Sequence, residues 1–254
     1  MKCCFIVSTG RTGTQTLARV IQQVDGDEIA AYHEPKPSRP FRFISTIHAA
    51  GILPDWLTLL SIRILRGRFI NRNSKFGYVE SNNFLFGVCG LLHKNFQNVR
   101  ILHVVRDPRD YAESHLKHGV FKGFKGVVGR FMPYWLIKPR HLNIKNDEYW
   151  LKMSPKKRLY WFWSLVNRVI EKDSVALGAD YRVVRFEDLF SDIEVFVDVL
   201  RWLGVDESKL EKASALMTER HNVGRYKIKN TSPDDHESLV DICGDQMQQY
   251  GYTF

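Results

Sequence analysis

A short turn near the start of the chain holds the residues best suited to chemistry. The apolar run at 3–7 predicts a β-strand, and Leu17, Val20, Ile21 and Val24 recur after it at helical spacing. A strand that passes through a glycine-containing turn into a helix aims backbone N–H groups and the positive end of the helix dipole at one point. We therefore predict a phosphate or sulfate site in this turn. Its candidate residues are Gly10, Arg11, Thr12, Gly13, Thr14, Gln15 and Thr16.

The turn lacks the lysine that nucleoside-triphosphate enzymes use. A P-loop that binds ATP ends in Gly-Lys-Ser/Thr, where the lysine contacts the transferred phosphate and the hydroxyl holds magnesium. Here the cation of the turn is Arg11, and Thr14 follows Gly13 directly. The pattern disfavours an ordinary kinase or ATPase.

A second strand end carries another candidate anion ligand. The run 101–105 reads as a buried strand, and Arg106-Asp107-Pro108 comes directly after it. Pro108 suits the first turn of a helix, and Arg106 beside that helix start offers a planar fork for a phosphate. The alternative is that Arg106 only pairs with the neighbouring aspartates in a solvated cluster, which would contribute little.

Together the two strand ends resemble the sulfotransferases that use 3′-phosphoadenosine 5′-phosphosulfate (PAPS). In that family the loop before the first helix reads as a basic residue, a small hydroxylated residue, Gly and Ser/Thr, and residues 11–14 match these positions. The family's 3′-phosphate site has a basic residue at a strand end and a serine eight positions later, which match Arg106 and Ser114. A third segment, 181–189, is similar to a later strand and helix start. The resemblance runs in order from residue 3 to about residue 190.

Predicted strands alternate with predicted helices along the chain. The strands are expected at 3–7, 29–33, 76–80, 101–105 and 181–185, and the helices at 17–24, 57–65, 84–96, 159–170, 193–203 and 208–217. This alternation predicts an α/β fold with a mostly parallel central sheet flanked by helices, and with ligands at the carboxyl ends of the strands. With 254 residues, 44% of them hydrophobic, a single domain over 1–254 is expected. The resemblance implies the same P-loop-like architecture.

The resemblance also implies roles for the candidate residues. Arg11, with the amides of 13–16, is expected to stabilise the transferred sulfuryl group and the departing 5′-phosphate. Arg106 and Ser114 are expected to bind the 3′-phosphate. The family usually has Lys in place of Arg11, and a guanidinium clamps charge without acting as a proton-donating acid. The expected cofactor is PAPS, with adenosine 3′,5′-bisphosphate as its product and no metal required.

A weaker match lies near the carboxyl end. The segment 220–227 resembles, in degraded form, the basic glycine-containing loop that many family members fold over the 3′-phosphate. Arg225 is the candidate ligand there. An exposed basic loop without a ligand is the alternative.

Three residues compete for the role of general base, which takes the proton of the acceptor. Pro35 keeps Glu34 out of helical geometry, so the Glu34 carboxylate is expected where the strand 29–33 gives way to a loop, on the same edge as the phosphate turn. The sequence His33-Glu34-Pro35 also resembles a segment of bacterial family members. We predict Glu34 as the base, with His33 as a backup or an orienting residue and Glu80 as the runner-up. An ion pair with a local cation is the alternative role for Glu34.

Positive charge is concentrated in two segments of a chain whose formal net charge is +9. The segment 35–79 holds eight Lys or Arg against the single acid Asp55, and 115–146 holds seven against none. The second includes a basic loop region, rich in glycine and aromatics, at about 117–146, which is expected either to cover the acceptor or to pack in the core. Basic walls attract a charged cofactor and an anionic acceptor. The surroundings fit a small-molecule or glycan acceptor, anionic or lipid-linked.

Cysteine usage and hydropathy indicate where the protein works. Cys3, Cys4, Cys89 and Cys243 form no Cys-x-x-Cys pair, so neither a disulfide framework nor a zinc site is predicted. No signal-peptide core or membrane span is recognisable, and a cytoplasmic protein is expected.

Two other functions stay open at the level of sequence. An atypical phosphotransferase, or kinase, would use Asp107 to hold magnesium. A non-enzymatic binder of nucleic acid or anionic membrane would use the basic segments and residues 56–68. Neither explains Arg106 together with Ser114, and no nucleic-acid partner is expected.

Overall fold

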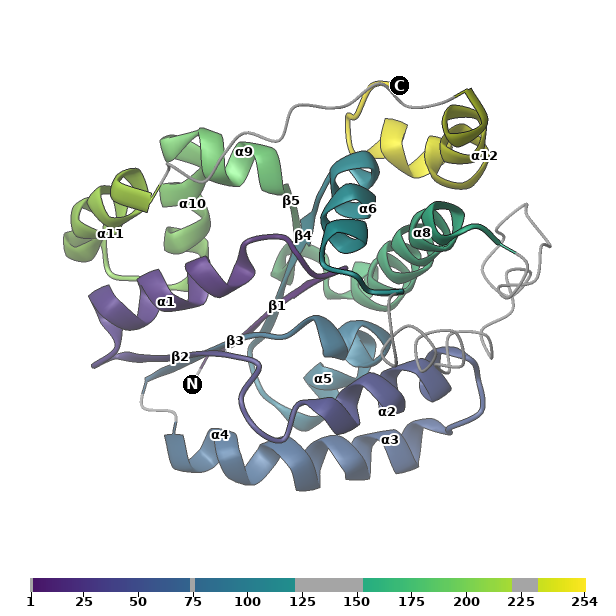
Figure 1. The fold of residues 1–254 in the computed structure, drawn as a ribbon. Helices are drawn as coiled ribbons and strands as arrows, with labels where there is room; N and C mark the ends of the chain where they lie inside the picture. The colour runs from purple at the N-terminus through teal and green to yellow at the C-terminus, as the bar shows by residue number, and fades with distance from the viewer. Residues whose placement is uncertain (1, 74–75, 122–152, 221–232) are drawn as a thin grey trace.

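The computed structural model describes residues 2–73, 76–121, 153–220 and 233–254 (Figure 1). Most of the basic loop region at 117–146, and Arg225, lie outside these residues. Five strands form one parallel sheet in the order β2-β3-β1-β4-β5. Their bounds are Lys2–Ser8 for β1, Ile29–His33 for β2, Gly77–Ser81 for β3, Val99–Val105 for β4 and Tyr181–Arg185 for β5.

Helices cover both faces of the sheet, which confirms the predicted α/β fold (Figure 1). One face carries α1 (Thr14–Asp25), α9 (Phe186–Ser191), α10 (Ile193–Leu203) and α11 (Glu207–Arg220). The other carries α2 (Arg39–Ala49), the 3₁₀ helix η2 (Asn83–Val88), α5 (Cys89–Asn95), α6 (Pro108–Lys117), α8 (Pro155–Ser174) and α12 (Pro233–Gln249). On the outside of that second face, α3 (Asp55–Ile62), the π-helical turn η1 (Arg63–Gly67) and α4 (Arg68–Asn73) follow one another without a break. None of the helices described is both long and apolar enough to cross a membrane.

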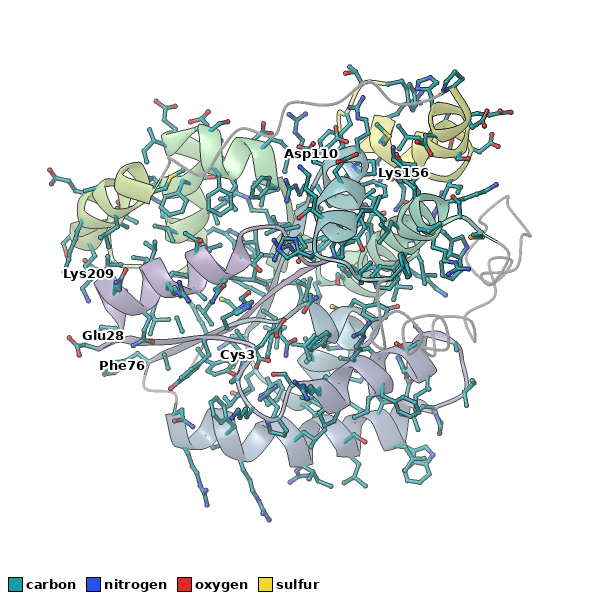
Figure 2. All side chains as sticks on the ribbon, in the orientation of Figure 1. Cys3, Glu28, Phe76, Asp110, Lys156 and Lys209 are labelled. Carbon is teal, nitrogen blue, oxygen red and sulfur yellow. The ribbon has the colours of Figure 1, made fainter. Side chains whose placement is uncertain are left out.

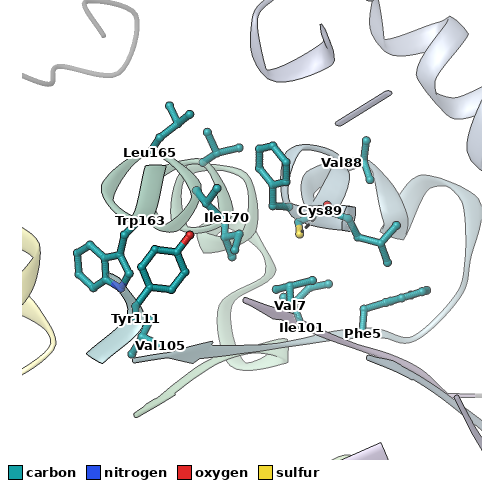
Figure 3. Packing of buried hydrophobic residues seen from close by; sticks show 14 of the residues in the cluster. Phe5, Val7, Val88, Cys89, Ile101, Val105, Tyr111, Trp163, Leu165 and Ile170 are labelled. Atoms are coloured by element: carbon teal, nitrogen blue, oxygen red, sulfur yellow. Dashed lines mark hydrogen bonds between the residues drawn. The ribbon is translucent and has the colours of Figure 1, made fainter. Parts of the chain in front are cut away.

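Alternating side chains of the central strand β1 divide the hydrophobic core in two. Cys3, Phe5 and Val7 point to the face covered by α5 and α8, whereas Cys4 and Ile6 point to the face covered by α1 and α10. Successive strand residues face opposite sides, and both faces of a central parallel strand are buried, so the run is apolar throughout. Figure 3 shows part of the first cluster, packed between the strands and the helices above them.

The chain changes its direction of winding at β1. From β1 it passes to β2 and back to β3 on one side, and then to β4 and β5 on the other. Helix α1 starts shortly after β1, and α6 shortly after β4, so two neighbouring strands both lead into helices at the same edge. In open parallel sheets, ligands bind at such a switch point. The topology therefore places both predicted anion-binding segments side by side.

The elements differ from the sequence-based expectation mainly on the outside of the molecule. Strands β2 and β5 and helix α10 have the predicted bounds. Apolar periodicity does not reveal α2, α9 or α12, although Pro40 and Pro233 in the first turns of α2 and α12 are helix-start signals. The helix expected at 84–96 begins instead as a 3₁₀ helix, where the Asn82 side chain accepts a hydrogen bond from the Phe84 amide.

All four cysteines are buried as unpaired thiols. Burial raises the pKa of the Cys3 thiol to about 11 and that of Cys4 to about 12. Burial likewise raises the pKa of Cys89 and Cys243. The four thiols therefore stay protonated at neutral pH, without the thiolate that reacts or binds metal.

We predict that Gly87→Ala destabilises the fold by about 1–3 kcal/mol, because overpacking a close contact forces the backbone apart. A Cβ at Gly87 would lie 2.2 Å from the carbonyl oxygen of Ser45 in α2. Urea unfolding followed by circular dichroism measures the change. Gly67→Ala is the matched control, since its Cβ would meet only Arg63 Cγ at 3.8 Å. Equal stability of the two variants would contradict the close packing of η2 on α2.

Candidate functional site

The turn after β1 is held in shape by the side chain of Ser8, the last residue of that strand. Ser8 Oγ accepts hydrogen bonds from the Gly10 amide at 3.0 Å and from Thr12 Oγ1 at 2.8 Å. Three residues of the turn have left-handed backbone: Gly10 with φ 89°, Arg11 with φ 60° and Gly13 with φ 65°. Gly13 is also the N-cap of α1, without a side-chain cap. The turn therefore leads directly into α1, and no side chain caps the first N–H groups of this helix.

Most amides of the turn are available to a ligand. Among the described residues, no acceptor is found for the backbone N–H groups of residues 11–15. The Thr16 amide differs, because it donates to the Gly13 carbonyl at 2.8 Å inside the first turn of α1. The amides without an acceptor among the described residues thus run from Arg11 to Gln15, whereas the Thr16 amide is already engaged within α1.

Two aromatic rings of α9 explain why residue 13 must be glycine. A Cβ at Gly13 would lie 2.6 Å from the ring of Phe190 and 3.0 Å from that of Phe186. Together with the left-handed φ, this contact leaves no room for a side chain. The site is therefore built from β1, α1 and α9 together.

Arg106, at the end of β4, is tied to the turn. The residue is only 5% exposed, and its Nη1 donates to the carbonyl oxygen of Arg11 at 2.6 Å. The guanidinium lies 4.6 Å from the centre of the Phe186 ring, whereas Asp110 Oδ2 stands 4.0 Å from Nη2. The hydrogen bond from Arg106 to the turn is thus shorter than the distance between Arg106 and Asp110. Arg106 is not a member of a solvated charge cluster.

The side chain of Arg11 closes the connection between the two strand ends. Its Nε donates to Ser114 Oγ at 3.2 Å, and its Nη2 lies 2.8 Å from His118 Nε2. His118 Nδ1 is 2.8 Å from the Ser114 carbonyl, which fits the tautomer with the proton on Nδ1. Arg11, Arg106 and Ser114 therefore converge as the sequence predicts. The sequence signal for His118 is weak, because it consists only of a place four residues after Ser114 on the same helix face.

The loop after β2 holds the predicted base. Glu34 is partly exposed and has a left-handed φ of 45°, and its amide donates to the Ser81 carbonyl at 2.9 Å. The end of β2 is two strands away from β1, or about 10 Å at the usual strand spacing. No ion pair of Glu34 occurs in the described part of the chain, so the alternative role as a local ion-pair partner is not supported there.

His33 lies next to Glu34 and contacts the end of β3. Its Nδ1 is 3.1 Å from Ser81 Oγ. Partial burial and the charge of Arg19 lower the pKa of His33, while Glu34 raises it. Neutral imidazole at pH 7 follows, so His33 can accept a hydrogen bond near Glu34.

Glu80 has a structural role rather than the runner-up role of base. It is fully buried and pairs with Arg66 Nε at 3.0 Å, with Tyr78 Oη at 2.6 Å and Asn82 Nδ2 at 2.8 Å as further donors. Burial raises the pKa of Glu80, which Arg66 opposes. With every oxygen engaged inside the fold, Glu80 cannot reach an acceptor. Arg66 likewise does not belong to the exposed basic wall expected over 35–79.

The aspartate that a phosphotransferase would need is also engaged. Asp107 caps α6 by accepting from the Arg109 amide at 2.8 Å, and its carboxylate pairs with the Arg109 guanidinium at 2.6 Å. Glu187, in the segment 181–189, accepts from the Asp107 amide at 3.0 Å and from Tyr252 Oη at 2.7 Å. These contacts fix the start of α6. Because the Asp107 carboxylate is bonded to Arg109, it is poorly placed to bind magnesium.

Comparison with proteins of known structure identifies the architecture. A sulfotransferase domain from the curacin biosynthetic pathway is 15% identical with a TM-score of 0.54, covering 100% of this chain and 98% of that one. A sulfotransferase from Alicyclobacillus acidocaldarius is 16% identical with a TM-score of 0.54, covering 100% and 97%. The chain has the fold of these sulfotransferases. Sulfotransferase STF9 from Mycobacterium avium is similar too, at 11% identity and a TM-score of 0.58, covering 100% of this chain and 78% of that one. No protein-family model and no curated protein sequence matches the chain.

Arg11, Arg106 and Ser114 form a cluster at the switch point of the sheet. Within the described residues, no group of three His, Cys, Asp or Glu side chains is placed to hold a metal ion. Two cations, Arg11 and Arg106, meet at this point, and the Asp110 carboxylate lies 4.0 Å from Arg106. Cations and free amides together suit an anionic ligand.

We predict that Glu80→Gln destabilises the protein by about 3–5 kcal/mol, because it leaves the buried Arg66 charge without its partner. Urea unfolding measures the loss. Glu34→Gln is the matched control: its carboxylate is partly exposed and makes no ion pair in the described part of the chain, so a change within about 0.5 kcal/mol is expected. A Glu80→Gln protein as stable as Glu34→Gln would show that the buried pair does not support the fold.

Proposed function

We propose that the protein is a PAPS-dependent sulfotransferase that moves a sulfuryl group to a hydroxyl or amine of an acceptor. The observation that carries the proposal is the convergence of Arg11, Arg106 and Ser114 beside the start of α1. Two arginines, a serine hydroxyl and a row of free amides suit a ligand with two separate phosphate-type groups. The likeness of the fold to three sulfotransferases points the same way.

The residues at β1 hold the end of the donor that carries the sulfuryl group. The amides of residues 11–15 and the Arg11 guanidinium stabilise the negative charge that develops on the departing 5′-phosphate. Arg11 keeps its proton throughout, because guanidinium does not deprotonate in proteins. A departing phosphate is a stable anion at neutral pH, so no proton donor is needed at this position.

The residues at β4 hold the other end. Ser114 Oγ and the Arg106 guanidinium are buried and bonded to the turn at one edge of the sheet. We assign to them the 3′-phosphate. Since Arg106 also bonds the Arg11 carbonyl, binding of one phosphate group is coupled to the shape of the turn that binds the other.

Glu34 acts as the general base. As the acceptor oxygen or nitrogen bonds to sulfur and the bond from sulfur to the phosphate oxygen breaks, the Glu34 carboxylate takes the acceptor proton. Its partly exposed position and left-handed backbone at the end of β2 leave the carboxylate free of ion pairs in the described part of the chain. His33 orients Glu34. The products are the sulfated acceptor and adenosine 3′,5′-bisphosphate, with a small molecule or glycan, anionic or lipid-linked, as the acceptor.

The proposal predicts that adenosine 3′,5′-bisphosphate binds without metal. At about one hundred times its dissociation constant it should stabilise the protein by about 2.7 kcal/mol. Arg106→Ala should weaken this binding by about 10- to 150-fold, as expected for a charge-assisted hydrogen bond, and should also lower the melting temperature because it frees the turn. Calorimetry measures the affinity.

Arg100→Ala is the matched control. Arg100 lies near the opposite end of the same strand, where it pairs with Asp180 at 3.1 Å. Its removal should leave bisphosphate affinity unchanged. A thermal shift with ATP and magnesium but none with the bisphosphate would refute the proposed donor.

A further prediction is that Glu34→Gln lowers turnover by about 10²–10⁴, the usual contribution of a positioned base. Bisphosphate affinity should stay as in the natural sequence, because Gln keeps the size of the side chain. Release of bisphosphate from PAPS in the presence of a panel of phenols and sugars measures turnover. Glu28→Gln, an exposed glutamate at the opposite edge of the sheet (Figure 2), is the control and should retain full rate. Normal turnover in Glu34→Gln together with its loss in His33→Ala would move the base to His33.

A further inference from the structure

The continuous helical rod of α3, η1 and α4 carries two opposite stripes at four-residue spacing. The inner stripe consists of Thr58, Ile62, Arg66 and Ile70, each at most 1% exposed. The outer stripe consists of Trp56, Leu60, Ile64, Arg68 and Arg72, all of them exposed. The i→i+5 bonds of η1 wind the backbone more loosely than an α-helix does, which keeps both stripes in register along the rod.

The apolar half of the outer stripe is not used by the fold. Trp56 is 65% exposed, Leu60 48% and Ile64 62%. A helix that packs on one face normally turns polar residues to solvent, whereas α3 is apolar on both faces. Figure 2 shows side chains of the rod projecting away from the body of the molecule. Exposed apolar side chains gathered in one row indicate an interaction surface.

The other half of the stripe is positively charged. Arg68 and Arg72 continue the row, Arg63 lies beside it, and no carboxylate pairs with these three in the described part of the chain. The one acid of the rod, Asp55, is held by His48 at 3.1 Å and by Lys94 at 3.6 Å. The surface thus combines an interfacial tryptophan and aliphatic side chains with uncompensated arginines.

We propose that the outer stripe docks on an anionic membrane surface. Tryptophan and aliphatic side chains insert at the boundary between headgroups and acyl chains, while arginines contact anionic headgroups. Two copies of the chain joined through this stripe would bring like charges together, which disfavours self-association as its role. The proposal does not rest on sulfuryl transfer, because docking needs no cofactor.

One buried side chain, that of Arg66, links the rod to the candidate site, so docking on the rod can influence that site. Arg66, on the inner stripe, donates from Nη1 to the Pro35 carbonyl at 3.0 Å and from Nη2 to the Pro37 carbonyl at 3.4 Å. Its guanidinium also lies 4.9 Å from the Phe41 ring centre. The rod is therefore joined to the loop that follows Glu34.

Sedimentation with vesicles tests the proposal. Vesicles of phosphatidylcholine with phosphatidylserine should bind the protein, vesicles of phosphatidylcholine alone should bind it weakly, and added salt should weaken the binding. Each arginine near an anionic surface is worth about five-fold in affinity, so Arg68→Gln with Arg72→Gln should cost about 25-fold. Trp56→Ser with Leu60→Ser should lower the affinity for these vesicles by at least about ten-fold, because it removes apolar surface that the membrane would bury. Both pairs are exposed, so melting temperatures should not change.

Matched variants on other surfaces separate the stripe from the overall positive charge. Arg19→Gln with Lys212→Gln removes two exposed cations from α1 and α11, across the sheet from the rod, and should change binding by less than about two-fold. Ile193→Ser with Val240→Ser is the apolar control. No binding to phosphatidylserine vesicles, or equal losses in stripe and control variants, would overturn the proposal. So would a dimer in sedimentation velocity that Trp56→Ser with Leu60→Ser converts to monomer.

Discussion

The hydrogen bond from Arg106 to the carbonyl oxygen of Arg11 joins two strand ends that no local sequence feature connects. It turns that carbonyl toward β4 and holds Arg11 in a left-handed conformation. Phe186 lies against the same guanidinium and against Gly13, so α9 is fixed by the same contact. The turn, the start of α1 and the start of α6 are therefore linked by direct contacts at the switch point of the sheet.

Strands and the strand-turn-helix units are predictable from sequence for a physical reason. A central parallel strand is buried on both faces, so 3–7 and 101–105 are apolar runs that few other structures produce. The outer helices are less predictable, because only one face is buried and polar residues dilute the pattern, as in α2 and α12. The convergence of Arg11, Arg106 and Ser114 follows once the order of the strands is known, and that order comes from the structure.

Contacts between distant segments set the limit of sequence reasoning about the site. A glutamate at the end of a predicted strand reads as a candidate base, yet Glu80 is enclosed by Arg66, Tyr78 and Asn82. Whether a polar residue faces solvent or a buried partner depends on segments far away in the chain, which periodicity does not report. The contacts of His118 with Arg11 and of Phe186 with Arg106 are unpredictable from sequence for the same reason. The place of Glu34 in the loop after β2 was predictable because Pro35 disfavours helical backbone before it, and its role as base stays a prediction.

The burial of the four thiols makes the protein suited to site-specific spectroscopy. Native cysteines that stay protonated and enclosed compete poorly for thiol-directed reagents. A single cysteine introduced on the exposed surface would therefore accept a fluorophore or spin label while the natural cysteines stay in place. Motions of the turn after β1 relative to the rod become measurable in the otherwise unaltered chain.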